Sequence, residues 1–192
     1  PTFATTQPTP VLLPAGLTTS RDITGVNLFE NVRKQGALNL DGSSYAEVHD
    51  NASLDMTDAI TLEAWVYWDG TASDDGIIGR WGSLASDRNY MLYAATSTKI
   101  SLYINSSSSN YSSMTTGWHH IIGTYDKINR KLYVDGVLRD TDAMTAAITT
   151  STKPIEIGSY KHGETADARL YTNQIAQPRI YNRALTASEV LR

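Results

Sequence analysis

The sequence predicts an all-β protein, a two-sheet antiparallel β-sandwich with one short C-terminal helix. Short segments in which apolar and polar residues alternate recur along the chain, and a period of two is typical of strands. Turn residues separate these segments at close spacing, which favours hairpins. Eleven Tyr and four Trp against two Phe suit half-buried strands whose aromatic rings keep a polar tip near water. Together these observations indicate two stacked sheets.

Residues 118–139 give the clearest strand signal. Trp118, His120, Ile122 and Thr124 share one face of an extended chain, and the residues between them share the other. The Asp135-Gly136 pair lies between two valines and predicts a type I′ hairpin turn, which needs positive φ at both central positions. The segment is therefore predicted to form three antiparallel strands at 118–125, 130–134 and 137–139. Trp118 itself, which follows a glycine, is expected to be a core anchor.

Residues 59–68 form the longest predicted strand. Both faces carry bulky side chains: Ile60, Leu62, Ala64, Val66 and Trp68 on one, and Thr61, Glu63, Trp65 and Tyr67 on the other. Such a strand is central, and either packing covers both of its faces or its outer face is aromatic.

The N-terminal segment differs from the rest of the chain. Residues 1–36 are predicted to form a Pro-rich extended arm with a first strand near 26–29, and residues 37–192 to form the sandwich domain. Four prolines among the first sixteen residues exclude a helix or a central strand there. The arm is either a disordered linker or an assembly contact that lies on a neighbouring subunit through Val11, Leu12 and Leu13.

The last residues carry a helix signal. Thr186 followed three residues later by Glu189 forms a capping box, which predicts a short helix at the C-terminus.

Composition excludes several classes of protein. The net charge is −4 and the charges are interspersed, so no basic stripe is present and nucleic acid is not an expected partner. There is no Cys, which excludes disulfides and thiolate metal sites. No apolar run approaches the roughly 18 residues that a membrane span needs, so membrane insertion is not expected.

Six segments in order resemble the laminin G-like, concanavalin A-like jelly-roll modules, a group that includes the pentraxins. They are residues 38–68, 76–82, 115–126, 131–138, 155–159 and 179–190. The resemblance implies a concanavalin A-like jelly roll over residues 37–192. It says much less about function, because function belongs to sites rather than to folds.

The chain departs from that family in the strand before residues 179–182. Ala176-Gln177 stands where the family usually has an acidic pair, and some relatives use an acidic residue of this strand to bind a structural calcium ion. Alanine offers no ligand atom, so the resemblance does not carry that site over. Pro178 removes a ladder hydrogen bond and predicts a bulge or an edge position.

Calcium is the one metal that the sequence brings into consideration, although no cofactor is expected to be required. Oxygen-rich loops suit a hard cation. Two loops offer acidic side chains, Asp69, Asp74 and Asp75 in one and Asp50, Asn51 and Asp55 in the other. Neither has the fixed spacing of a known calcium loop.

Catalytic residues are not predicted. Glycan hydrolysis needs two carboxylates across a cleft, and Glu63 is the only carboxylate within a strong strand. The Glu-x-Asp-x-x-Glu strand motif of related glucanases is absent. Adjacent His119 and His120 point to opposite faces of a strand, so one metal ion would not use both without distortion. No Gly-x-Ser-x-Gly elbow or phosphate loop occurs.

Aromatic residues in loops or at strand ends, beside amide and carboxylate groups, are typical of glycan binding. The predicted ligand-binding residues are Trp68, Trp81, Asp87, Asn89, Asn110, Tyr111, Tyr160 and His162. Half-buried sandwich aromatics are the alternative interpretation of Trp68 and Trp81.

The sequence therefore predicts a non-catalytic binding module, displayed extracellularly or on a cell or virion surface, that recognises glycan or protein. The alternative is a structural subunit of an assembly, such as a virion decoration or fibre protein, whose N-terminal arm contacts neighbouring subunits in a homo-oligomer. A glycoside hydrolase or lyase is the third and least supported hypothesis.

Overall fold

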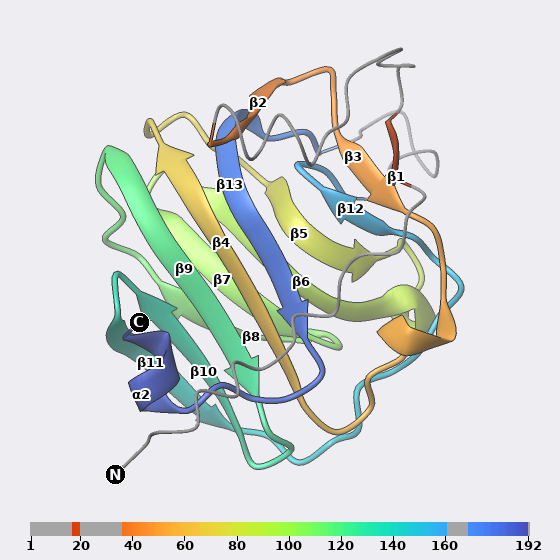
Figure 1. Ribbon diagram of the computed structural model, residues 1–192. Helices are drawn as coiled ribbons and strands as arrows, with labels where there is room; N and C mark the ends of the chain where they lie inside the picture. The colour runs from red at the N-terminus through yellow and green to blue at the C-terminus, as the bar shows by residue number, and fades with distance from the viewer. Residues whose placement is uncertain (1–16, 20–35, 161–168, 192) are drawn as a thin grey trace, which may run out of the picture.

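The computed structural model, which describes residues 17–19, 36–160 and 169–191, confirms the two-sheet β-sandwich (Figure 1). Its strands are β1 (Leu17–Thr19), β2 (Leu38–Asp41), β3 (Ala46–Val48), β4 (Ile60–Trp68), β5 (Asp75–Trp81), β6 (Arg88–Thr96), β7 (Lys99–Ile104), β8 (Ser107–Tyr111), β9 (Gly117–Tyr125), β10 (Asn129–Val134), β11 (Val137–Ala143), β12 (Ile155–Ile157) and β13 (Thr172–Tyr181). Two 3₁₀ turns, η1 (Ala52–Leu54) and η2 (Ala85–Asp87), and the short helix α2 (Ala187–Val190) complete the described elements.

The strands divide into two antiparallel sheets. The seven-stranded sheet has the order β1-β3-β12-β5-β6-β7-β8, and the six-stranded sheet has the order β11-β10-β9-β4-β13-β2. Figure 1 shows the six-stranded sheet in front of the seven-stranded one, with α2 beside β11. Since β1 pairs with β3, part of the N-terminal segment joins the sandwich.

The core lies between the sheets, where alternate residues of each strand face inward. On β4 the inward face is the one that carries Leu62 and Val66, and both side chains are fully buried. They belong to one large apolar cluster with Leu92 and Leu102 of the opposite sheet. Each such side chain contributes roughly 1.5–3 kcal/mol by leaving water, which is why the alternating pattern dictates the fold.

The central meander forms as predicted, except that its third strand, expected to end at residue 139, continues to Ala143. Asp135 and Gly136 have φ of 54° and 74°, the left-handed conformation that a type I′ turn requires. Val134 pairs with Val137 across the turn. The Asp135 carboxylate also accepts a hydrogen bond from the backbone N–H of His120 at 2.9 Å, which ties the turn to β9.

Helix α2 covers only one end of the outer face of the six-stranded sheet. Val190 and Leu185 pack there against Ile122 and Tyr133. The predicted capping box is present, since Glu189 accepts a hydrogen bond from the backbone N–H of Thr186 at 2.9 Å. The other end of this face lies beyond the helix.

A bulge interrupts β13, as Pro178 predicted. Its register against β4 shifts between Ala176 and Arg179. Within the bulge Gln177 has φ of 49°, a left-handed conformation that is uncommon for a residue other than glycine. The bulge turns the Gln177 side chain into solvent.

Two expectations about local structure differ from the fold, and a third concerns residues that the structure does not describe. Trp118 is not a core anchor, because its side chain lies on the outer face of β9 and is 40% exposed. Residues 106–110, expected to be a loop, contribute most of strand β8. The strand expected near residues 26–29 lies outside the described residues.

Candidate functional site

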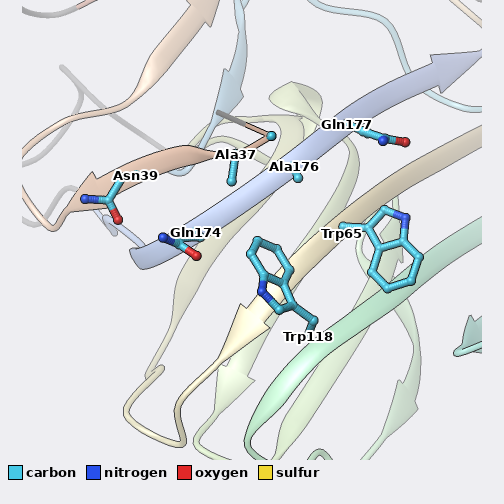
Figure 2. Close-up of a pocket in the computed structure, with 8 residues that line it drawn as sticks. Ala37, Asn39, Trp65, Trp118, Gln174, Ala176 and Gln177 are labelled. Carbon is cyan, nitrogen blue, oxygen red and sulfur yellow. The ribbon is translucent and has the colours of Figure 1, made fainter. Parts of the chain in front are cut away.

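An open groove of about 670 Å³ crosses the uncovered end of the six-stranded sheet. It is lined by Gly36, Ala37, Asn39, Trp65, Trp118, Gln174, Ala176 and Gln177. Figure 2 shows Trp118 between Gln174 and Trp65, with Asn39 at one end and Gln177 at the other. The groove therefore crosses β2, β13, β4 and β9, and these strands supply two indole rings and three primary amides.

Strand register explains why these residues meet. Asn39 of β2 pairs with Gln174 of β13, which places two amides side by side. Ala176 of β13 pairs with Trp65 of β4. Because the alanine side chain is small, it leaves the space beside the indole ring open.

Trp65 is exposed yet held in place. Its side chain is 38% exposed. One face of the indole stacks on His120, with ring centroids 4.8 Å apart and an interplanar angle of 13°. His120 thus occupies one face of the ring, while the side chain remains partly exposed and lines the groove.

Trp118 is the second exposed indole of the groove. It pairs with Tyr67 across the β4–β9 ladder, and the two rings meet edge to face with centroids 5.7 Å apart. Such aromatic pairs add about 0.5–1.5 kcal/mol beyond the area that they bury. The contact therefore supports Trp118 without covering it.

Glu63 connects three residues beside the groove on the same face of the sheet. Its Oε1 accepts hydrogen bonds from His120 Nε2 at 3.0 Å and from Arg179 Nη1 at 2.8 Å. Its Oε2 accepts one from the Tyr181 hydroxyl at 2.7 Å. A carboxylate only accepts, so His120 must carry its proton on Nε2.

Arg179 extends this network to the groove itself. Its Nη2 donates a hydrogen bond to Gln177 Oε1 at 2.8 Å. Because a guanidinium has donors only, the carbonyl oxygen of Gln177 must face Arg179. The amide nitrogen of Gln177 therefore remains as the group that this side chain can offer a ligand.

The network also fixes the ionisation of Glu63. Burial by itself would raise the pKa of the carboxyl, but the hydrogen bonds from His120 and Tyr181 and the charge of Arg179 outweigh it and lower the pKa below the usual range. Burial, together with the hydrogen bond to Glu63, raises the pKa of Tyr181 to about 12. At neutral pH the site thus holds an ionised carboxylate and a protonated phenol.

Trp68, predicted to bind a ligand, lies in the core instead. Only 1% of its surface is exposed, and its indole N–H donates to the backbone carbonyl of Ser97 at 2.6 Å. It faces inward because it lies three residues from Trp65 on β4, and an odd spacing on a strand points to the opposite face. No ring face of Trp68 is free for a sugar.

Trp81 and Tyr160 lie in an aromatic cluster on the outer face of the seven-stranded sheet. Both are buried, and they pack with Met91, Tyr93 and Tyr103. Tyr103 meets Trp81 edge to face at 5.1 Å, and the Arg88 guanidinium lies 5.6 Å from the centre of the same ring. The Tyr160 hydroxyl donates to Asp74 at 2.8 Å. This packing favours the alternative interpretation of Trp81 as an aromatic residue of the sandwich, and the ligand-binding role of Trp81 and Tyr160 stays a prediction.

Asn89 and Asp87 are likewise apart from the groove. Asn89 is fully buried, where its amide nitrogen donates to the carbonyl of Thr149 at 2.6 Å and its amide oxygen accepts from Ser151. It therefore supports the fold. Asp87 ends the 3₁₀ turn η2, and its backbone carbonyl accepts from the N–H of Gly82 at 3.0 Å.

Asn110 and Tyr111 end strand β8 at the edge of the seven-stranded sheet. The Asn110 amide oxygen accepts from the Ser101 hydroxyl at 2.7 Å. Arg139 lies over the Tyr111 ring at 4.6 Å from its centre. Both residues are partly exposed, but they do not line the groove. Their ligand-binding role stays a prediction.

Four of the predicted contact residues cannot be placed. His162 and the apolar residues of the arm, Val11, Leu12 and Leu13, lie outside the described residues. The predictions about an assembly contact and a homo-oligomer therefore stay predictions.

The acidic loops considered for calcium are occupied by cationic side chains. Arg80 is fully buried and donates to Asp50, to Asp55 at 2.6 Å and to the carbonyl of Lys153 at 2.7 Å. In the other loop Asp74 accepts from Tyr93 and Tyr160 and pairs with Arg169 at 3.1 Å. Within the part of the chain that the structure describes, no three His, Cys, Asp or Glu side chains are arranged to hold a metal ion.

The groove offers recognition chemistry. Among the described residues that line it, none carries a carboxylate, an imidazole or an amine. Glu63, two residues from Trp65 on the same face of β4, is a single carboxylate with both oxygens already hydrogen-bonded. Hydrolysis of a glycosidic bond by the usual routes needs a pair of carboxyl groups, whereas indole faces and amides bind sugars without bond making.

A family model described as the concanavalin A-like lectin/glucanases superfamily, of laminin G type, matches residues 40–191. The chain belongs to this superfamily. The match covers both sheets from β2 onward and ends in the residue after α2. It confirms the resemblance carried by the six sequence segments.

Solved structures share the fold at low sequence identity. A botulinum neurotoxin type C structure, described in connection with cell entry through two ganglioside molecules, has a TM-score of 0.67 and 16% identity, over 92% of this chain and 45% of that one. Domain 4 of an extracellular arabinanase from Geobacillus stearothermophilus, in complex with arabinotriose, has a TM-score of 0.59 and 21% identity, over 81% and 74%. The binding domain of a paraclostridial mosquitocidal protein has a TM-score of 0.59 and 17% identity, over 81% and 41%.

The present chain spans less than half the length of each of the two toxin chains and about three quarters of the arabinanase domain. At these identities the likeness establishes the jelly-roll fold. No curated protein sequence matches the chain. None of the helices in the described ranges has the length and apolar character needed to cross a membrane.

Proposed function

We propose that the protein is a non-catalytic, extracellular glycan-binding module and that the groove on the outer face of its six-stranded sheet is the binding site. One observation carries the proposal: two exposed indole rings, Trp65 and Trp118, line an open groove together with the amides of Asn39, Gln174 and Gln177.

Sugars match this combination of groups. The C–H face of a sugar ring is apolar and packs on an indole face, while its hydroxyls exchange hydrogen bonds with amides. Contiguous exposed apolar patches on soluble proteins often serve as interaction sites, so two exposed tryptophans in one groove support a binding role. The groove volume lies within the range of about 300–1,000 Å³ that small-ligand sites occupy.

The comparisons support the proposal in one respect. The arabinanase domain, which this chain matches over most of its length, was solved with arabinotriose, so the fold is one that holds an oligosaccharide in another protein. The ganglioside interaction named for the neurotoxin belongs to a chain more than twice as long as the matching part.

A glycan array tests the proposal. The wild-type chain is expected to bind at least one class of oligosaccharide, and both Trp65→Ala and Trp118→Ala are expected to weaken that binding by about 2 kcal/mol, or roughly thirtyfold. The matched control is Leu84→Ala, which removes a large exposed apolar side chain that does not line the groove. Equal binding by all four proteins, or binding of no glycan, would refute the proposed site or function.

A further inference from the structure

We propose that the groove selects uncharged glycans. In this proposal Arg179 orients the side chain of Gln177, whose amide donates a hydrogen bond, and the position of that donor determines which sugar oxygen accepts the bond. This inference rests on the proposed function and names the ligand class of the same groove.

The described lining contains no charged side chain. Its polar groups are the amides of Asn39, Gln174 and Gln177, and its apolar groups are the two indoles and two alanines. A carboxylate or sulfate in the groove would lose part of its hydration shell without meeting a cation among the described lining residues, and an unpaired charge that loses hydration is strongly disfavoured. A neutral hydroxyl would be satisfied by an amide.

Among the described residues, the two charges next to the groove, those of Arg179 and Glu63, are already paired. Arg179 donates to Glu63 at 2.8 Å, so the guanidinium and the carboxylate cancel each other. The nitrogen that Arg179 directs toward the groove donates to Gln177 Oε1 at 2.8 Å. An acidic ligand would have to break one of these bonds to reach the guanidinium. The chain's net charge of −4 adds a weak repulsion against anionic ligands.

The bulge on β13 places Gln177 at one end of the groove. Gln177 has φ of 49°, which is uncommon for a residue other than glycine. It also precedes Pro178, and a residue before proline normally prefers an extended conformation. Strain of this kind costs of the order of 1–3 kcal/mol and persists where the surroundings hold it. Here Arg179 holds the side chain, and its bond to Oε1 leaves the Nε2 hydrogens to point at a ligand.

Binding to paired probes tests the ligand class. The probes are oligogalacturonides and their methyl-esterified forms, which share one sugar backbone and differ in whether the carboxyl group is charged, and dextran with dextran sulfate. All are used at about physiological ionic strength so that surface charge is screened. The neutral member of a bound pair is expected to bind at least tenfold more tightly than the acidic member, and Trp65→Ala is expected to remove most of that binding.

Gln177→Glu tests the donor. The substitution keeps the shape and the Arg179 contact but replaces the amide donor by an acceptor, so binding of the neutral probe is expected to fall about tenfold at unchanged melting temperature. Gln177→Ala removes the same amide without adding a charge and is expected to lower binding of the neutral probe to a similar extent, which separates the loss of the donor from the added negative charge. Arg179→Lys cannot form the same fork to Glu63 and Gln177 and is expected to lower binding of the neutral probe as well.

The outcomes separate the inference from the proposed function. If an acidic probe binds as tightly as its neutral partner and depends on Trp65, the groove binds glycans but the proposed selectivity is wrong. If Gln177→Glu binds the neutral probe like the wild type, the role of Gln177 is wrong. If no probe binds in a Trp65-dependent manner, the proposed function fails and this inference fails with it.

Discussion

The rings of Trp65 and His120 lie face to face, with centroids 4.8 Å apart and planes within 13° of parallel. His120 is held in turn by Glu63 at 3.0 Å. The exposed indole is therefore backed by a ring that a buried carboxylate orients. Such support keeps the exposed indole of Trp65 in one position before a ligand arrives, which lowers the entropic cost of binding.

Removal of His120 should weaken glycan binding although His120 does not line the groove. We expect His120→Ala to lower the affinity up to about tenfold, because an aromatic pair contributes roughly 0.5–1.5 kcal/mol and the unsupported indole gains freedom. Isothermal titration of the bound oligosaccharide with His120→Ala, Trp65→Ala and the double variant measures the effect.

The double-mutant cycle decides whether His120 acts through Trp65. In that case the double variant binds no more weakly than Trp65→Ala alone, since nothing remains to be positioned. The matched control is His119→Ala, the neighbouring histidine, whose side chain bonds to Asp135 at 2.7 Å instead of stacking on Trp65. Strictly additive losses would contradict a positioning role.

Glu63 should stabilise the fold through its ionised form. Its pKa in the folded protein lies below the usual value of 4.5. The stabilisation is therefore complete above the pKa of the unfolded chain and is lost as the pH falls through the pKa of the folded protein. We expect Glu63→Gln to lower the free energy of unfolding at pH 7 by about 1–3 kcal/mol, because it weakens hydrogen bonds from His120, Arg179 and Tyr181.

Denaturant unfolding at pH 7 and at pH 3 measures this contribution. Other carboxyls, such as Asp41 with a pKa of about 2, lose stabilisation in the same direction, but they are present in both proteins and cancel in the difference. The gap between the wild type and Glu63→Gln should shrink at pH 3. A gap of equal size at both pH values would show that the charge on Glu63 does not stabilise the fold.

The fold was predictable because its causes are local. Alternation along β4 and β9 and the Asp135-Gly136 turn depend on neighbouring residues alone, and each predicted the observed strand. The division of β4 into two faces was also right. Which of those faces meets the second sheet depends on packing across the sandwich, and both faces carry bulky residues.

The missed residues of the site follow from that one ambiguity. Trp65 and Trp118 lie on the outer faces that the alternation defined, but the prediction placed Trp68 at the binding site and Trp118 in the core. The sequence did contain a signal for the outer face. Glu63 shares one face of β4 with Trp65, and His120 shares one face of β9 with Trp118. Charged residues are rarely buried unless they are paired, so these two faces were the better candidates for the outside of the sandwich. The partners of Glu63 on β13 are 116 and 118 residues away and leave no pattern in the sequence.

The ion-pair partners of Arg80 in the core were also not predictable from the sequence. Its guanidinium is fully buried and binds Asp50 and Asp55, which precede it by 30 and 25 residues. We expect Arg80→Met to destabilise the protein by about 3 kcal/mol, at the low end for a broken buried pair because both carboxylates are about one-third exposed. The melting temperature should fall by roughly 6–12 °C.

A surface pair provides the control for this substitution. Lys127 contacts Asp58 at 2.6 Å, but both side chains are exposed. Lys127→Met should change stability by less than about 1 kcal/mol. If the two variants melt at the same temperature, Arg80 does not have the stabilising role that its burial indicates.

Calcium should have no effect on the wild type. Arg80 already neutralises Asp50 and Asp55, and Arg169 pairs with Asp74, so a divalent cation would have to displace a guanidinium from either loop. We expect equal melting temperatures in millimolar calcium and in excess chelator. A ligand that binds only the folded state must raise the melting temperature, so a rise with calcium would reveal a site and contradict this expectation.

Gly123 should be required for the close packing of the two sheets. A Cβ added at this inward position of β9 would lie 2.6 Å from Cδ1 of Leu102 in the opposite sheet. We expect Gly123→Ala to destabilise the fold by about 1–3 kcal/mol through overpacking. Leu102→Val frees part of that volume and costs about 1 kcal/mol alone. The double variant should then lose less stability than the sum of the single losses, as measured by denaturant unfolding. Additive losses would mean that the alanine methyl group is accommodated without contact with Leu102. That result would contradict the predicted clash between the two sheets.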